Sequence, residues 1–138
     1  MGAIYIAKYI LREEYQCKCC SMLPPDYDEP YSESFDLLFS SFERIRDQWG
    51  APLHISSGYR CPCHNSFIGG HPLSAHQFGL ALDIDVEDYQ VEALHKIINK
   101  VAPDLRIGRY QGFVHIDTAY CIHPRASEAW VRGYRWSE

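Results

Sequence analysis

Two short segments of the chain alternate apolar and polar residues, and this alternation constrains the fold more than any other feature of the sequence. They are residues 80–86, LALDIDV, and residues 112–118, GFVHIDT. Successive side chains of a β-strand point to opposite faces of a sheet. The aliphatic residues of both segments can therefore face a core, while Asp83 in the first and His115 and Asp117 in the second occupy an open face. We predict two strands that each present polar side chains on one side.

Apolar residues at helical spacing predict two helices. The first covers residues 32–49 and is capped by Ser32 or Ser34. The second covers residues 88–101 and is capped by Asp88. Further short strands are expected over residues 53–57 and 105–110.

The order of these elements indicates an α+β fold, with a small antiparallel sheet flanked by helices. A chain of 138 residues, 46% of them hydrophobic, suits one domain, to which we assign residues 1–138. The net charge of -5 argues against binding to nucleic acid, because neutralising phosphates needs a basic surface. No apolar run approaches the roughly 20 residues of a membrane helix, so we expect no membrane partner. We also expect the protein to be a monomer.

The N-terminal sequence, MGAIYIAKYILREE, has neither a basic lead nor a small-residue cleavage site. A secretory signal peptide needs both of these features. We therefore expect a protein made in the cytoplasm without a signal peptide.

Three polar residues in and near the alternating segments can form a metal site. If the two strands are neighbours, Asp83 and His115 converge over the open face of the sheet. His76 lies seven residues before Asp83, and a loop through the flexible Gly79 can bring it back as a third ligand. Two imidazoles and one carboxylate leave a position open for water, as a hydrolytic zinc requires.

Two other interpretations of these residues remain. Single histidines and aspartates near strand ends are usually solvated or hydrogen-bonded, and spacing by itself does not identify a ligand. Two histidines and one carboxylate also form the iron site of some oxygenases. Those oxygenases usually place the first histidine much closer to the carboxylate than His76 is to Asp83, which favours zinc.

Several ordered motifs resemble a known enzyme family. They are Ser57-Gly-Tyr-Arg60, Asn65, Gly69-Gly70, Ser74-Ala-His76-Gln-Phe-Gly79-Leu-Ala81-Leu-Asp83-Ile and Phe113-Val-His115-Ile-Asp117. In order and spacing they resemble the zinc D-alanyl-D-alanine carboxypeptidase and L-alanyl-D-glutamate endopeptidase family, whose fold is shared with hedgehog signalling domains. The resemblance covers nearly the whole chain and is closest to short members of phage-endolysin type.

The resemblance implies a cofactor, a substrate and roles for individual residues. It makes His76, Asp83 and His115 the ligands of one catalytic Zn²⁺, and peptidoglycan stem peptides the substrate. It gives Arg60 contact with the substrate, or with charge that develops on the scissile carbonyl, for which a guanidinium is well suited.

Two side chains near this set have further expected roles. Arg60 can alternatively be a structural arginine tied to a carboxylate, with Asp85 as a candidate partner. Ser74 is expected to steady the His76 loop by hydrogen bonding.

One position departs from the family pattern. Many members carry an acidic residue three positions before the last histidine ligand, where it serves as the general base, and here that position is Gly112. Asp117 shares a strand face with His115, and Asp85 shares one with Asp83. Either can act as the base or orient an imidazole from outside the ligand set. We take Asp117, in the matched His-Ile-Asp motif, as the preferred candidate for the base.

The chain has six cysteines, and some of them can bind a second zinc. Cys17 and Cys20 form a C-x-x-C pair, and Cys61 and Cys63 can supply two more thiolates. A ribbon-type site normally shows two C-x-x-C pairs, so free thiols or a disulfide formed after export stay open as alternatives. Three histidines are expected to have no metal-related role: His64, His71 and His123.

These features predict a zinc metallopeptidase that hydrolyses peptide bonds in peptidoglycan stem peptides, as a D-Ala-D-Ala carboxypeptidase or a murein endopeptidase. It is expected to act on the cell wall after release from the cell or as part of a virion. The alternative is a non-catalytic metal-binding module of the same fold that binds cell wall or a protein partner, and Gly112 keeps it open. A third interpretation is a cysteine-rich redox or structural protein.

Overall fold

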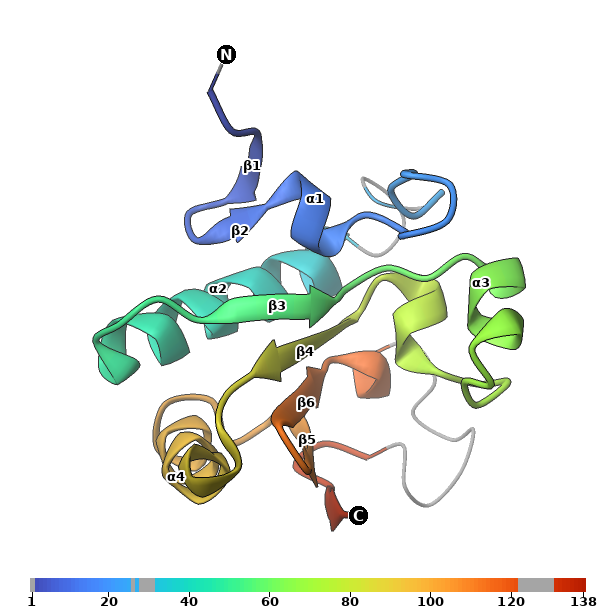
Figure 1. The fold of residues 1–138 in the computed structure, drawn as a ribbon. Helices are drawn as coiled ribbons and strands as arrows, with labels where there is room; N and C mark the ends of the chain where they lie inside the picture. Colours follow the sequence, from blue (N-terminus) through green and yellow to red (C-terminus); the bar gives the residue numbers. More distant parts are fainter. Residues whose placement is uncertain (1, 26, 28–31, 122–130) are drawn as a thin grey trace.

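The two alternating segments lie next to each other in a five-stranded sheet of order β3-β4-β6-β5-β7 (Figure 1). Neighbouring strands are antiparallel, except that β7 is parallel to β5. The strands are β3 (His54–Ser57), β4 (Ala81–Asp85), β5 (Arg106–Tyr110), β6 (Phe113–Asp117) and β7 (Arg135–Ser137). This computed structural model describes residues 2–25, 27, 32–121 and 131–138.

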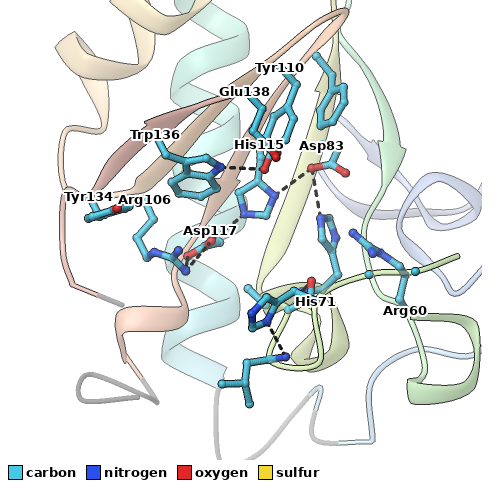
Figure 2. A pocket seen from close by; sticks show the side chains of 17 residues that line it. Arg60, His71, Asp83, Arg106, Tyr110, His115, Asp117, Tyr134, Trp136 and Glu138 are labelled. Atoms are coloured by element: carbon cyan, nitrogen blue, oxygen red, sulfur yellow. Dashed lines mark hydrogen bonds and ion pairs between the residues drawn. The ribbon is translucent and has the colours of Figure 1, made fainter. Parts of the chain in front are cut away.

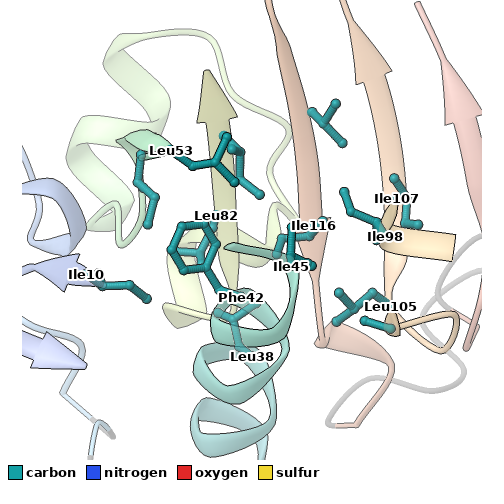
Figure 3. Packing of buried hydrophobic residues seen from close by; sticks show 14 of the residues in the cluster. Ile10, Leu38, Phe42, Ile45, Leu53, Leu82, Ile98, Leu105, Ile107 and Ile116 are labelled. Atoms are coloured by element: carbon teal, nitrogen blue, oxygen red, sulfur yellow. The ribbon is translucent and has the colours of Figure 1, made fainter. Parts of the chain in front are cut away.

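Two helices, α2 (Ser32–Trp49) and α4 (Val91–Val101), cover one face of this sheet. Phe42 of α2 and Ile98 of α4 belong to the same buried core as Leu82 of β4 (Figure 3). Burying one such side chain stabilises the fold by about 1.5–3 kcal/mol. The apolar halves of the alternating segments thus face the helices, which leaves the polar halves on the opposite face.

Shorter elements complete the described part of the chain. They are β1 (Tyr5–Ala7), β2 (Ile10–Leu11), α1 (Arg12–Tyr15), α3 (Pro62–Phe67) and the 3₁₀ turns η1 (Ala75–Phe78), η2 (Asp88–Gln90) and η3 (Ala119–Cys121). β1 and β2 pair with each other in a separate two-stranded sheet. Among the helices of the described residues, none is both long and apolar enough to cross a membrane.

The expected α+β fold, both long helices and the four expected strands are confirmed, and three details differ. The sheet is larger than predicted and mixed, because β7 joins it in parallel. α2 covers Ser32–Trp49, so both Ser32 and Ser34 lie inside the helix, and the position before Ser32 lies outside the described residues. The second helix is entered through η2, whose N-cap is Glu87 and not Asp88. The Glu87 N–H donates to the side chain of Gln90 at 3.1 Å, which moves the cap one residue earlier.

The N-terminal segment is held against β3 by buried polar contacts. Glu14 in α1 is buried and accepts the N–H of Ile55 at 2.9 Å. Just after β3, the Tyr59 N–H donates to the carbonyl of Tyr15 at 2.7 Å. This close approach requires glycine at position 58, because a Cβ there would lie 2.7 Å from the Tyr15 backbone. The loop that follows β3 is therefore anchored on α1.

Candidate active site

Asp83 and His115 lie directly opposite each other on β4 and β6. The His115 Nδ1 lies 3.0 Å from Asp83 Oδ1, and the Nε2 of His76, which comes from η1, lies 3.2 Å from the same oxygen. The potential ligand atoms of all three residues are within 4.8 Å of one another. All three side chains are buried. The structure thus brings the three predicted ligands together at one point on the open face of the sheet.

The turn around His76 explains how this side chain reaches the sheet. Ser74 caps η1, and its Oγ accepts the N–H of His76 at 3.3 Å, which confirms its expected steadying contact. Gly79 ends the turn with a φ of 73°. A Cβ there would lie 2.4 Å from the hydroxyl oxygen of Tyr15, which donates to the Gly79 carbonyl at 2.6 Å. A larger residue at position 79 would therefore push the turn away from Tyr15.

Both imidazoles have a second partner on the side away from Asp83. His76 Nδ1 donates to the carbonyl oxygen of Gly58 at 2.7 Å, and because a carbonyl only accepts, this nitrogen carries a proton. His115 Nε2 lies 2.7 Å from Asp117 Oδ2. Metal-bound histidines typically donate their outer ring N–H to a carbonyl or a carboxylate in this way. The arrangement leaves His76 Nε2 and His115 Nδ1 facing Asp83.

The three clustered groups differ in charge. Burial lowers the pKa of His76 and so favours its neutral form. Burial also opposes the charged form of His115, but hydrogen bonds and charges of Asp117 and Asp83 raise its pKa to about 9. Burial opposes ionisation of Asp83, yet the two histidines hold its pKa well below the usual range. A metal ion that binds here must therefore displace a proton from His115.

Asp117 is fully buried and contacted from three sides. It pairs with His115, with Arg106 Nη1 at 3.2 Å, and with the backbone N–H of Ala119 at 3.1 Å. Arg106 is its direct neighbour in the register of β5 and β6. A carboxylate held in this way is well placed to orient an imidazole. The contacts favour the orienting role of Asp117, and its role as a general base stays a prediction.

A pocket of about 920 Å³ opens above the three clustered residues (Figure 2). This volume lies within the usual range for small-ligand sites. Arg60 lies on one side of the pocket, and Tyr110, Trp136 and Glu138 lie on the opposite side. His76, Asp83 and His115 are therefore accessible to a ligand despite their burial.

Arg60 is placed in this pocket by a hydrogen bond to a buried amide. Its Nη1 donates to Asn65 Oδ1 at 3.0 Å, and Asn65 in turn donates to the carbonyl of His71 at 3.0 Å. Burial lowers the pKa of Arg60, an effect that the charge of Asp83 opposes. The guanidinium thus stays close to the predicted ligands.

The alternative in which Arg60 pairs with Asp85 is wrong. Asp85 lies opposite His54 at the far end of β4, 3.9 Å from the His54 ring, and does not line the pocket. The strand carries Asp85 two residues beyond Asp83, away from the loop that holds Arg60. For the same reason Asp85 neither orients a clustered histidine nor contacts the pocket as a base.

Several pocket residues lie outside the predicted site, among them Arg106, Tyr110, Trp136 and Glu138. Trp136 Nε1 donates to the Tyr110 hydroxyl at 2.8 Å, and its indole crosses Gly108, where a Cβ would lie 2.4 Å from the ring. The alternation of residues 105–110 would reveal Arg106 and Tyr110, because both share the open face with Gly108. β7 has only three residues and shows no comparable pattern.

The remaining histidines expected to be unrelated to metal do not join the cluster. His71 lines the pocket, and its Nδ1 accepts the N–H of Leu73 at 3.0 Å. His64 lies in α3. Among the described residues, neither belongs to a group that could hold an ion, and His123 lies outside those residues.

A second cluster of ligand atoms lies beside the N-terminal segment. The Sγ atoms of Cys17, Cys19, Cys20 and Cys61 are all within 4.8 Å of one another, and all are free thiols. Burial opposes ionisation of Cys17, but N–H groups of Cys61, Cys19 and Cys20 bond to its sulfur and lower its pKa to about 6. The prediction that Cys63 belongs to such a group is wrong. Cys61 caps α3, which leaves Cys63 exposed in its first turn.

The fold and the site together define a class of protein. It is an α+β domain in which the sheet and the turn η1 together present two histidines and one carboxylate at the floor of a pocket, a donor set that suits zinc. The chain matches the family model described as Peptidase M15 over residues 13–117 and belongs to that family, whose members are zinc-dependent metallopeptidases. The match confirms the resemblance to this peptidase family, and the α+β architecture agrees with the hedgehog-like fold that the resemblance implies. None of the curated proteins compared with the chain matches it.

Proposed function

We propose that the protein hydrolyses peptide bonds in peptidoglycan stem peptides with one zinc ion held by His76, Asp83 and His115. The convergence of these three residues at the floor of an open pocket carries the proposal. Membership of the peptidase family supports zinc-dependent hydrolysis. The ordered motifs support a peptidoglycan substrate, because they resemble carboxypeptidases and endopeptidases that act on stem peptides.

The donor atoms follow from the contacts that the three side chains already make. His76 would offer Nε2 and His115 would offer Nδ1, because Gly58 and Asp117 occupy their other ring nitrogens. Asp83 would offer a carboxylate oxygen. When bound, zinc would polarise the scissile carbonyl and lower the pKa of a water molecule.

The pocket walls offer complementary contacts for a short peptide. Arg60 and Arg106 are cations in the pocket lining and can bind a substrate carboxylate or stabilise negative charge on a carbonyl oxygen. Tyr110 and Phe113 stack with a centroid distance of 4.5 Å and offer apolar surface to small side chains such as alanine. The combination suits a peptide with a free carboxylate and small side chains.

Glu138 is our candidate for the proton acceptor. The usual acidic position holds Gly112, which forms the turn between β5 and β6 with a φ of 85°. The described carboxylates that line the pocket are Asp83, Asp117 and Glu138. The first is the proposed ligand and the second is held by its three partners. Glu138 lines the pocket on the same side as Tyr110 (Figure 2).

Incubation of purified peptidoglycan with the zinc-loaded protein is expected to release peptide fragments that increase with time. Mass spectrometry of the products separates loss of one terminal alanine from cleavage within the stem peptide. Protein treated with a chelator serves as the control and is expected to release nothing until zinc is restored. Zinc-saturated protein that releases no fragment from any peptidoglycan tested would contradict the proposal.

A non-catalytic module is the second candidate, and the glycine at position 112 favours it. Such a module would bind cell wall or a protein partner through the same pocket. Zinc-loaded protein that sediments with peptidoglycan but releases no fragment would support it. The phage-endolysin setting, with action on the wall after release, belongs to the first candidate and is supported by the resemblance to short phage-type members.

Asp117→Asn is expected to weaken zinc binding by about 10–100-fold. The neutral amide replaces the charged carboxylate that accepts the N–H of His115 Nε2 and orients the ring. The change also removes the charge opposite buried Arg106, which is expected to lower the free energy of unfolding by up to about 3–5 kcal/mol. Competition with a chromophoric chelator measures the first effect, and denaturant unfolding measures the second.

Asp104→Asn is the matched control for this change, because Asp104 is exposed and pairs with exposed Arg132. It is expected to leave zinc binding unaltered. If Asp117→Asn bound zinc as tightly as the unmodified protein but lost about 100-fold or more of its hydrolysis, Asp117 would be the base and not an orienting group.

A further inference from the structure

The cysteine cluster lies outside the pocket and takes no part in the proposed hydrolysis. Cys17, Cys19 and Cys20 come from the segment after α1, and Cys61 comes from the loop between β3 and α3. We propose that these four thiolates bind a second zinc ion, which has a structural role. The proposal rests on this cluster alone and does not depend on the proposed hydrolysis.

The sulfur atoms are spaced as ligands of one ion would be. Cys19 Sγ lies 3.6 Å from Cys17 Sγ and 3.5 Å from Cys61 Sγ. Tetrahedral zinc with Zn–S bonds of about 2.3 Å separates its sulfur ligands by about 3.8 Å. All four sulfurs fall within 4.8 Å of one another, so an ion between them would meet all four. The set is a complete Cys₄ site of the kind that holds structural zinc.

Exposure distinguishes this cluster from ordinary apolar packing. Cys17 is buried and Cys61 is half-buried, but Cys19 and Cys20 are exposed. A free cysteine in a core behaves as a small apolar side chain and is among the most buried residue types. Burial of apolar surface does not explain why two exposed thiols lie beside a buried one. A metal ion bound by all four sulfurs does explain it.

Two of the sulfurs each accept a hydrogen bond from a backbone N–H group. The N–H of Cys61 donates to Cys17 Sγ at 3.4 Å, and the N–H of His64 donates to Cys61 Sγ at 3.4 Å. Hydrogen bonds of this kind favour the ionised form of the acceptor. The thiolate is the form in which cysteine binds a metal ion.

A closed turn holds the three N-terminal cysteines together. The Ser21 N–H donates to the Cys17 carbonyl at 2.8 Å, and the Cys17 N–H donates to the Met22 carbonyl at 3.0 Å. Ser21 has a φ of 60° and is the one non-glycine residue with positive φ in the described part of the chain. This conformation costs a residue with a side chain about 1–2 kcal/mol. Four metal–sulfur bonds across the turn would readily offset that cost.

The bound ion would fix the loop that shapes the pocket. Cys61 directly follows Arg60, whose N–H donates to the His76 carbonyl at 2.9 Å. The same loop carries the Gly58 carbonyl that accepts the proton of His76 Nδ1. An ion that ties Cys61 to Cys17 therefore holds both contacts of His76 in place, although it lies outside the pocket.

Zinc content measured by mass spectrometry on full-length variants tests the proposal. All variants carry His115→Ala, so that an ion at the sheet site does not contribute. Addition of Cys61→Ser is expected to remove one zinc per chain. Addition of Cys63→Ser, an exposed cysteine two residues further on, is the matched control and is expected to retain it. Equal zinc in the two double variants would overturn the assignment.

A measurement on the unmodified protein covers the case in which Cys61→Ser fails to fold. With zinc present, only Cys63 and Cys121 are expected to react rapidly with a thiol reagent. After chelation and denaturation all six cysteines are expected to react.

Cobalt substitution is expected to give the near-ultraviolet sulfur-to-metal charge-transfer absorption of a thiolate site, which Cys17→Ser should abolish.

Three results would overturn the proposal. The first is rapid reaction of all six thiols in zinc-saturated protein. The second is an intact mass two hydrogens lower than that of the reduced chain, which would show a disulfide in place of the ion. The third is iron bound at the four sulfurs in protein produced with both metals available, because Cys₄ sets also accept iron.

Discussion

His115→Ala and Asp83→Asn are each expected to abolish zinc binding at the sheet site and, with it, hydrolysis of peptidoglycan. Each change removes one of only three protein ligands, so the loss of affinity should exceed the roughly 100-fold that loss of an outer hydrogen-bond partner can cost. Their side chains lie opposite each other, and neighbouring residues offer no substitute ligand within the described cluster. Zinc content after gel filtration and release of peptide fragments measure the two effects.

Asp85→Asn is the matched control for these changes. Asp85 lies on the same strand two residues beyond Asp83, contacts His54, and stays outside the pocket. It is expected to keep both zinc and activity. Full occupancy of the sheet site in the His115→Ala and Asp83→Asn variants would refute the ligand assignment. Zinc retained by the cysteines is counted separately, by its loss in the Cys61→Ser variants.

Glu138→Gln is expected to lower the rate of hydrolysis by about 10²–10⁴-fold while zinc binding stays unchanged, because an amide cannot accept the proton from water. The backbone of Glu138 donates to the Arg109 carbonyl at 2.9 Å, and this contact does not depend on the side chain. The variant should therefore keep β7 in place. Initial rates of fragment release at saturating zinc, measured across a pH series, record the effect.

The pH series distinguishes a proton acceptor from a structural residue. Loss of a proton acceptor lowers the rate at every pH of the series while zinc content stays unchanged, whereas loss of a structural contact lowers the rate and the zinc content together. Glu43→Gln is the matched control, because Glu43 is on α2, which covers the other face of the sheet, and pairs with Lys8. Unchanged rates in Glu138→Gln would exclude Glu138 and return the role to Asp117.

The faces of β4 and β6 are predictable from sequence because a period of two leaves only one way to bury the aliphatic residues. Their register is not, since the pairing of Asp83 with His115 depends on how the two strands meet in the folded chain. α3 is not predictable from the sequence, because its six residues lack apolar periodicity and only Asn65 is buried. β7 is not predictable either, because a strand of three residues is defined only by its pairing with β5.

Some features of the candidate site are likewise predictable from the sequence, and others are not. The ligand set His76, Asp83 and His115 is predictable because the resemblance names it and the strand alternation puts Asp83 and His115 on one open face, whereas their convergence depends on the pairing of β4 with β6. The partnership of Asp117 with Arg106, and the placement of Glu138, depend on strands that are distant in sequence. The cysteine grouping was partly wrong for a similar reason, since α3 selects Cys61 and leaves Cys63 exposed.

The cross-strand position of Asp83 and His115 has a consequence for how the chain folds. A slip of β6 by one residue against β4 would turn His115 toward the helices and separate the two donors. An ion at 1,000 times its dissociation constant would stabilise the native pairing by about 4 kcal/mol and contribute nothing to the slipped one. A bound metal ion would therefore stabilise only those molecules in which β4 and β6, which are distant in sequence, have paired in the native register.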